Sequence, residues 1–124
     1  MTYRLSVHDG FAAAHRLAGS GGKCESLHGH NFRVTLEVTG DQLDGSGMLL
    51  DFGDLKKILR SVLEELDHSD LNEHRAFRDS GPSSENIARF IWGQVNDMLD
   101  LETVRVASVT VNESETASAR YEPE

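Results

Sequence analysis

The chain contains a single cysteine, Cys24, in 124 residues. One cysteine cannot form an intramolecular disulfide, so Cys24 is either a small core residue or a functional thiol. Long apolar runs are also lacking, because no segment approaches the ~20 residues that cross a bilayer, and the N-terminus has neither the basic start nor the apolar run of a signal peptide. These absences predict a cytoplasmic protein without a membrane partner.

Basic residues are scarce as well. Lysine and arginine together number 12 against 21 acidic residues, which gives a net charge of −9. No basic stripe is present that could displace counterions from phosphates, so a nucleic-acid partner is excluded. A phosphate-bearing ligand would need a local basic cluster that acts against the overall field. With 38% hydrophobic residues and no internal repeat, linker or low-complexity segment, residues 1–124 are predicted to form a single domain.

Residues 23–30, KCESLHGH, hold the only cysteine and two of the six histidines. In an extended chain, side chains two apart point to the same face, so His28 and His30 present neighbouring imidazoles. The following apolar residues keep this parity: Phe32, Val34, Leu36 and Val38. Two imidazoles on one apolar face are hard to satisfy without a metal or carboxylates, and the spacing suits a small tetrahedral ion such as zinc.

A third ligand must come from elsewhere, and His15 is the best candidate because it shares a face with Phe11 and Ala13. Taken alone, a residue like His15 is more often a core histidine whose ring nitrogens are hydrogen-bonded than a metal ligand. Cys24, four residues before His28, has three interpretations. It is a fourth ligand in a closed structural zinc site, an inert core thiol, or a base or nucleophile beside an open zinc.

Two further candidates lie later in the chain. Asp67 and His68 follow a predicted helix, where a histidine can simply interact with the helix dipole. Glu113 is expected to share the face of Ala107, Val109 and Val111. It is therefore either a rim carboxylate at a strand end or a buried carboxylate that binds something.

Periodicity predicts the secondary structure. Alternation predicts strands at residues 3–15, interrupted by a bulge or turn at Asp9-Gly10, and at residues 30–39, 104–113 and 117–121. Helical spacing predicts an amphipathic helix at residues 52–66 and a second one up to residue 99, whose start at Pro82-Ser83-Ser84-Glu85 offers a hydroxyl cap. The order β-β-α-α-β-β predicts an α+β fold in which both helices cover one face of a four-stranded antiparallel sheet.

Five segments together are far more specific than any one of them: FAAAHRL (11–17), CESLHGHN (24–31), LDHSDLN (66–72), PSSEN (82–86) and VNE (111–113). In this combination the chain resembles the 6-pyruvoyl-tetrahydropterin synthase family over nearly its whole length. The three-residue gap between Cys24 and His28 is similar to the branch that makes 6-carboxy-5,6,7,8-tetrahydropterin for queuosine-type deazapurines. Ser83 departs from the threonine common in the family but keeps the hydroxyl.

The resemblance implies the tunnelling fold (T-fold), in which sheets join into a trimeric barrel and two trimers stack as a hexamer with active sites between subunits. It implies a lyase acting on 7,8-dihydroneopterin triphosphate. Zinc on His15, His28 and His30 would keep an open position for the substrate side chain and act as a Lewis acid.

The resemblance also implies roles for individual residues. Cys24, as a thiolate, would remove a proton from the substrate side chain, and His68, oriented by Asp67, would carry protons on the other side. Glu113 would bind the pterin N–H edge. The residues expected to assist substrate binding are Ser83 and Ser84 at the pterin, and Lys23 and Arg16 at the triphosphate.

Three alternatives stay open. Some relatives lack the cysteine, carry a glutamate three residues before His-Gly-His, and make 6-hydroxymethyl-dihydropterin. Glu25 occupies that position here, so it is a candidate second base, although a solvent-facing Glu25 is favoured. A 6-pyruvoyl-tetrahydropterin synthase is the second alternative, and a non-catalytic zinc module closed by Cys24 is the third.

Overall fold

The computed structural model describes residues 2–100 and 102–124. Its longest feature is an antiparallel pair formed by β1 (Tyr3–His15) and β2 (His28–Gly40), whose register runs without interruption. The predicted bulge or turn at Asp9-Gly10 is therefore wrong. Gly10 is accommodated within the strand because the two backbones approach closely there. A Cβ at this position would lie 2.9 Å from the carbonyl oxygen of Phe32.

Three further strands complete the sheet. β4 (Val104–Ser114) pairs antiparallel with β2, and β5 (Ala117–Tyr121) pairs antiparallel with β4. A two-residue strand, β3 (Ser69–Asp70), pairs parallel with β1, which gives the order β3-β1-β2-β4-β5. The α+β class is confirmed, but the sheet is five-stranded and mixed rather than four-stranded and antiparallel. A two-residue strand is too short for side-chain alternation to reveal it.

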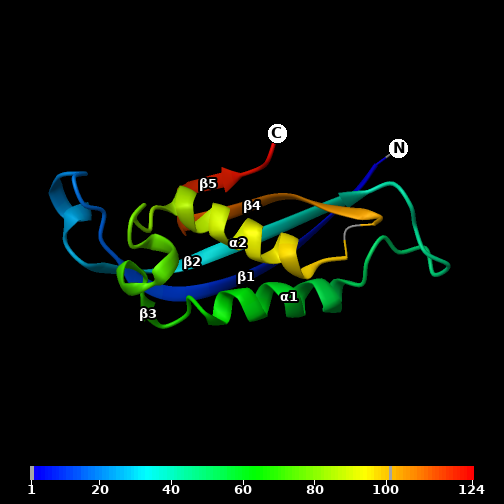
Figure 1. Ribbon diagram of the computed structural model, residues 1–124, viewed down its shortest axis with the longest axis horizontal. Coiled ribbons are helices and arrows are strands. Elements are labelled where there is room, and N and C mark those ends of the chain that lie inside the picture. Colours follow the sequence, from blue (N-terminus) through cyan, green and yellow to red (C-terminus); the bar gives the residue numbers. More distant parts are fainter. Residues whose placement is uncertain (1, 101) are drawn as a thin grey trace.

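Both helices cover one face of the sheet (Figure 1), as predicted. The Asp51 side chain accepts the N–H groups of Gly53 and Asp54 at the start of α1 (Phe52–Glu64). Ser83 similarly caps α2 (Ser84–Met98). Short 3₁₀ helices lie at η1 (Gly22–Glu25), η2 (Leu71–Glu73) and η3 (Arg75–Phe77). In the described part of the chain, no helix has the length and apolarity needed to cross a membrane.

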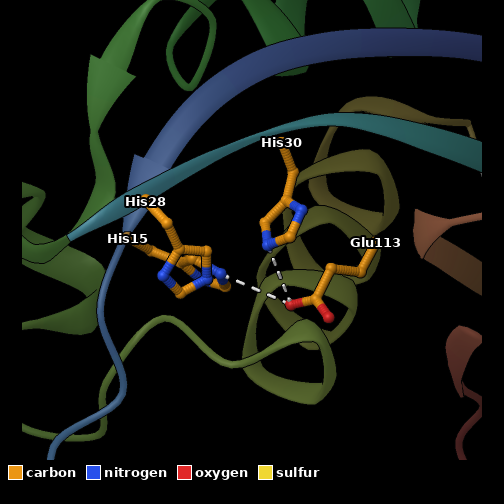
Figure 2. Close-up of side chains that lie close together, drawn as sticks. All are labelled: His15, His28, His30 and Glu113. Carbon is orange, nitrogen blue, oxygen red and sulfur yellow. Dashed lines mark ion pairs between the residues drawn. The ribbon is translucent and has the colours of Figure 1, made fainter. Parts of the chain in front are cut away.

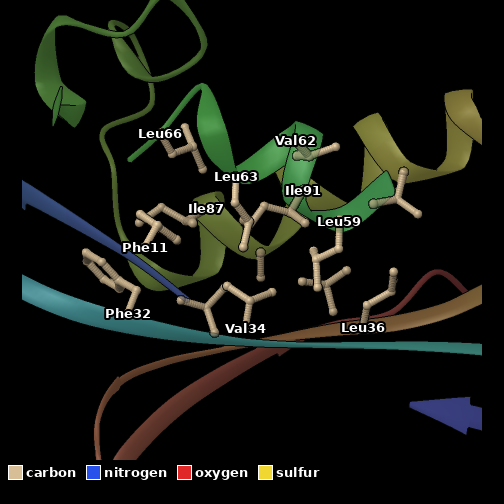
Figure 3. Packing of buried hydrophobic residues seen from close by; sticks show 14 of the residues in the cluster. Phe11, Phe32, Val34, Leu36, Leu59, Val62, Leu63, Leu66, Ile87 and Ile91 are labelled. Atoms are coloured by element: carbon tan, nitrogen blue, oxygen red, sulfur yellow. The ribbon is translucent and has the colours of Figure 1, made fainter. Parts of the chain in front are cut away.

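The core lies between the helices and the sheet (Figure 3). Its fully buried residues include Phe32, Val34 and Leu36 from β2, Leu59 and Leu63 from α1, and Ile87 and Ile91 from α2. Burying one such side chain contributes about 1.5–3 kcal/mol relative to leaving it exposed. The same face of β2 continues towards the start of the strand, where His30 and His28 replace the apolar residues. The packed core thereby fixes the direction of both imidazoles.

Two irregularities bend β4. The first falls at Ala107, which has no partner on β2 between the pairs Val38–Val106 and Glu37–Ser108. Val109 and Val111 point into the core as expected, whereas the predicted alignment of Ala107 with them is wrong. The second irregularity falls at Glu113, between Asn112 and Ser114 in the register with β5. Glu113 nevertheless stays on the face of Val109 and Val111, as predicted, because its Oε1 lies 3.5 Å from His30 Nε2.

Candidate metal and substrate site

Three histidines and one glutamate converge at one end of the sheet (Figure 2). We call His15, His28, His30 and Glu113 the metal-ligand group, because one ligand atom from each lies within 4.8 Å of all the others. His15 ends β1 directly opposite His28, which begins β2, and His30 follows on the same face. Glu113 arrives from the bulge in β4. The three histidines predicted as metal ligands thus lie together.

Backbone carbonyl groups orient two of the imidazoles. His15 is fully buried, and its Nδ1–H donates to the Pro82 carbonyl oxygen at 2.8 Å. The Nδ1–H of His28 donates to the Ser26 carbonyl oxygen at 2.7 Å. Because a carbonyl only accepts, both rings must carry their proton on Nδ1, which leaves Nε2 with a free lone pair. Histidines that bind metals have their other ring nitrogen engaged in this way.

The Nε2 atoms of His15 and His30 are buried and lack a hydrogen-bond partner. Both approach Glu113 Oε1, at 3.4 and 3.5 Å, which are ion-pair contacts only if the rings are protonated. Burial lowers the pKa of His30, Glu113 opposes this shift, and the other two histidines add to it. The net shift favours the neutral imidazole, which is the form that binds a metal. Three imidazoles and one carboxylate fit a divalent ion such as zinc, which would satisfy both unpaired nitrogens.

Cys24 lies outside the metal-ligand group, as far as the described residues are concerned. It is exposed in η1, where its carbonyl oxygen accepts the Leu17 N–H at 2.7 Å and closes the loop. Glu25, the next residue, accepts the Gly21 N–H at 3.0 Å with Oε1. The carboxylate of Glu113, rather than the Cys24 thiol, therefore lies beside the three histidines.

Asp67 and His68 form a pair at the edge of the sheet beside β1. The Nδ1 atom of His68 lies 3.0 Å from Asp67 Oδ1, which also accepts the Ala12 N–H at 2.9 Å. The hydrogen bond from Ala12 is the main cause that lowers the pKa of Asp67, and His68 and Arg60 add to it against partial desolvation. Arg60 NH2 lies 3.5 Å from Asp67 Oδ2.

His68 adopts an uncommon backbone conformation, with φ of 57°. Its N–H donates to the Ala12 carbonyl oxygen, which holds the turn, and its side chain is 82% exposed. Left-handed non-glycine residues of this kind are a few per cent of the total and often occur at functional sites. Within one chain, no hydrogen bond or ion pair between described residues joins the Asp67–His68 pair to the metal-ligand group.

The other residues predicted to bind substrate lie in two segments, at the start of α2 and between β1 and β2. Ser83 accepts the Asn86 N–H as the cap of α2, and half-buried Ser84 is the first residue of that helix. Arg16 and Lys23 are exposed in the segment that joins β1 to β2.

Some features of the site were missed from the sequence. Glu113 was predicted as a substrate residue, and its place beside the imidazoles results from the pairing of β4 with β2. The contacts of the Pro82 carbonyl with His15 and of Arg60 with Asp67 could not be predicted from the sequence, because they form only when separate elements pack together.

Comparison with known proteins gives consistent results. The family model for 6-pyruvoyl tetrahydropterin synthase matches residues 4–124. The putative 6-carboxy-5,6,7,8-tetrahydropterin synthase of Archaeoglobus fulgidus is 38% identical over 117 residues, which cover 94% of each chain. The Bacillus subtilis 6-carboxy-5,6,7,8-tetrahydropterin synthase is 36% identical over 98% of this chain and 86% of its own. The structure of Caenorhabditis elegans 6-pyruvoyl tetrahydropterin synthase superposes with a TM-score of 0.89 at 26% identity, covering 100% of this chain and 97% of the other.

Proposed function

Because the chain belongs to the 6-pyruvoyl tetrahydropterin synthase family, we propose that it converts 7,8-dihydroneopterin triphosphate and water to 6-carboxy-5,6,7,8-tetrahydropterin, acetaldehyde and triphosphate. The relatives that carry this product in their names cover most of the chain. The three-residue gap between Cys24 and His28 supports the same branch. The product would serve the synthesis of queuosine-type deazapurines.

One observation carries this proposal: two buried imidazole Nε2 atoms without partners face a carboxylate in the metal-ligand group. We propose zinc as the ion, held by His15, His28 and His30. When bound there, zinc supplies Lewis-acid chemistry that stabilises negative charge on oxygen. The Pro82 and Ser26 carbonyls keep the His15 and His28 rings in the binding orientation.

Glu113 is well placed to bind the pterin. Its Oε1 faces His15 and His30, and its side chain is 32% exposed, so the carboxylate is accessible at the rim. Oε2 can accept a pterin N–H in a charge-assisted hydrogen bond. Ser83 and Ser84, at the start of α2, are proposed to complete this side of the pocket.

Proton transfer is assigned to Cys24 and to the Asp67–His68 pair. A thiolate near a bound cation is favoured and can take a proton from the substrate side chain. Asp67 accepts the Nδ1–H of His68 and leaves Nε2 to move protons. Because no hydrogen bond or ion pair between described residues joins this pair to the metal-ligand group of its own chain, we propose that it serves a substrate held by a neighbouring copy in a homo-oligomer.

The test is to incubate the purified, zinc-loaded protein with 7,8-dihydroneopterin triphosphate and to identify the pterin by mass. The expected product is 6-carboxy-5,6,7,8-tetrahydropterin, and Cys24→Ala should abolish it. A 6-pyruvoyl product would assign the chain to another branch. Full zinc retention without any turnover would favour the non-catalytic module.

Glu25 is the residue on which the folate-type alternative depends. Its Oε1 is already hydrogen-bonded to the Gly21 N–H, so its role in the loop favours Cys24 as the base. If both groups reach the substrate, Cys24→Ala should still yield 6-hydroxymethyl-dihydropterin, with a larger share at lower pH, because a carboxylate is the weaker base. Absence of any pterin product from zinc-loaded Cys24→Ala at every pH would eliminate this alternative.

A further inference from the structure

A cavity of about 430 Å³ opens beside His15. Its volume lies within the range of small-molecule sites. It is lined by Arg16, Leu17, Ala18, Asn72, Phe77, Arg78, Asp79, Ser80, Gly81 and Ser83.

Both walls of the cavity are directly connected to the metal-ligand group. Arg16 follows His15 along the chain, and Ser83 follows Pro82, whose carbonyl oxygen accepts the His15 Nδ1–H at 2.8 Å. On either wall, one residue along the chain separates the cavity lining from His15 or from its Pro82 contact. The cavity therefore lies beside the metal-ligand group, on the Nδ1 side of His15.

Two asparagines hold the walls rigid. Asn72 clamps the Arg16 backbone, since its Oδ1 accepts the Arg16 N–H at 2.9 Å and its Nδ2 donates to the Arg16 carbonyl at 3.1 Å. On the other wall, Asn86 Nδ2 donates to the carbonyl oxygens of Ser80 and Gly81, at 3.1 and 3.0 Å. A wall fixed before binding costs less conformational entropy when a ligand enters.

The cavity is basic, although the chain as a whole is acidic. Arg16 and Arg78 supply two guanidinium groups against the single carboxylate of Asp79. Neither arginine forms an ion pair within 4.0 Å among the described residues, in contrast to Arg75, which pairs with Glu65 at 3.2 Å. Planar guanidinium groups bind phosphate oxygens through two parallel hydrogen bonds.

We propose that this cavity binds oligophosphate, with Arg16 and Arg78 as its charged groups, and that it holds the triphosphate tail of the substrate and the triphosphate released from it. The assignment to the tail rests on the proposed function. Arg78 is the new element, because nothing in its local sequence marks it as a binding residue. Phe77, only 2% exposed, anchors its backbone in the core.

Calorimetric titration of inorganic tripolyphosphate into the zinc-loaded protein tests the site directly. Arg78→Ala should weaken binding about tenfold, because a hydrogen bond to a charged group is lost. Arg78→Lys should recover part of the affinity, and Asp79→Asn should tighten binding by removing a repulsive carboxylate. The matched control is Arg75→Ala, which makes the same change in net charge on the same segment but outside the cavity. Zinc content must be measured after each titration, since polyphosphates also chelate divalent ions.

Equal tripolyphosphate affinity in wild type and Arg78→Ala would overturn the site. An equal loss in Arg75→Ala and Arg78→Ala would also overturn it, because the effect would then be one of net charge. Equally tight binding of orthophosphate would overturn the tail assignment and indicate a free-phosphate site. With 7,8-dihydroneopterin triphosphate, Arg78→Ala should raise KM about tenfold and leave kcat nearly unchanged. Arg78-dependent tripolyphosphate binding in a protein without turnover would refute the proposed function while supporting the oligophosphate site.

Discussion

At the scale of single residues, the buried Nε2 atoms of the metal-ligand group lead to the first prediction. His15→Ala, His28→Ala and His30→Ala should each weaken zinc binding by more than about 100-fold, since loss of a supporting hydrogen bond alone costs 10–100-fold. Zinc content after dialysis, measured by atomic absorption, is the readout. His8→Ala is the control, because His8 is exposed, forms a hydrogen bond with Thr35 and is not part of the metal-ligand group. Full zinc retention by any of the three variants would remove that histidine from the ligand set.

The second prediction separates substrate binding from metal binding at Glu113. Glu113→Gln replaces one carboxylate oxygen by an NH₂ group that opposes a pterin N–H donor, so KM should rise about tenfold or more. Zinc content should fall much less, because three imidazoles remain. Steady-state kinetics and metal analysis on the same preparation measure both effects. Unchanged kinetics would leave Glu113 as a rim residue, and a parallel loss of zinc would make it a metal ligand.

The third prediction concerns pH and Asp67, whose folded-state pKa lies below its ordinary value of 3.8. A lowered pKa means that the unfolded chain binds the proton more readily, so the carboxylate stabilises the fold above pH 3.8. That contribution is lost as pH falls from there through the lower folded-state pKa. Asp67→Asn should therefore lose stability relative to wild type at neutral pH, and the difference should shrink in acid. Urea unfolding of both proteins between about pH 3 and pH 7 measures the difference in their free energies of unfolding. A difference that does not change with pH would contradict the prediction.

At the scale of secondary-structure elements, the close approach of β1 and β2 leads to the fourth prediction. In Gly10→Ala the new Cβ would meet the Phe32 carbonyl oxygen at 2.9 Å, and a paired backbone can yield only by distorting the sheet. The expected loss of stability is about 1–3 kcal/mol, or several degrees in Tm. Gly93→Ala in α2 is the matched control, because its Cβ would meet nothing within 4 Å. The control should gain up to about 1 kcal/mol from the helix preference of alanine, and equal melting temperatures for wild type and Gly10→Ala would contradict the argument.

The elements also show where pattern analysis works. Alternation along β1 and β2 and helical spacing along α1 and α2 predicted these elements and their buried faces, because the backbone geometry alone fixes side-chain direction. Sequence periodicity did not reveal β3, which is too short to have a pattern. It also misplaced Ala107, because a bulge there shifts the alternation of side chains along β4.

At the scale of the whole molecule, the fifth prediction concerns assembly. A five-stranded sheet leaves β3 and β5 as edges with unpaired backbone groups, and symmetric association is a common way to cover them. We expect a hexamer, with a mass six times that of the chain, measured by sedimentation equilibrium. A monomer that turns over substrate would contradict the proposal.

Mixed oligomers provide a second measurement of the same arrangement. If His68 serves a substrate held by a neighbouring copy, Cys24→Ala and His68→Ala subunits are each inactive alone but should regain activity after dissociation and reassembly together. Cys24→Ala mixed with the double variant is the control and should stay inactive. No recovery in correctly sized mixed oligomers would place Cys24 and His68 in one subunit.

The sequence by itself determined the α+β class, the family, and the common face of His28 and His30, because strand and helix periodicity are local properties of the backbone. Only the tertiary structure decided that Glu113 joins the histidines, since the ends of β1, β2 and β4 come together only when the sheet forms. The same holds for the Pro82 carbonyl that orients His15, 67 residues away along the chain, and for the cavity that unites Arg16 with Arg78. Contacts between such distant residues arise from how the core packs, and no local pattern encodes them.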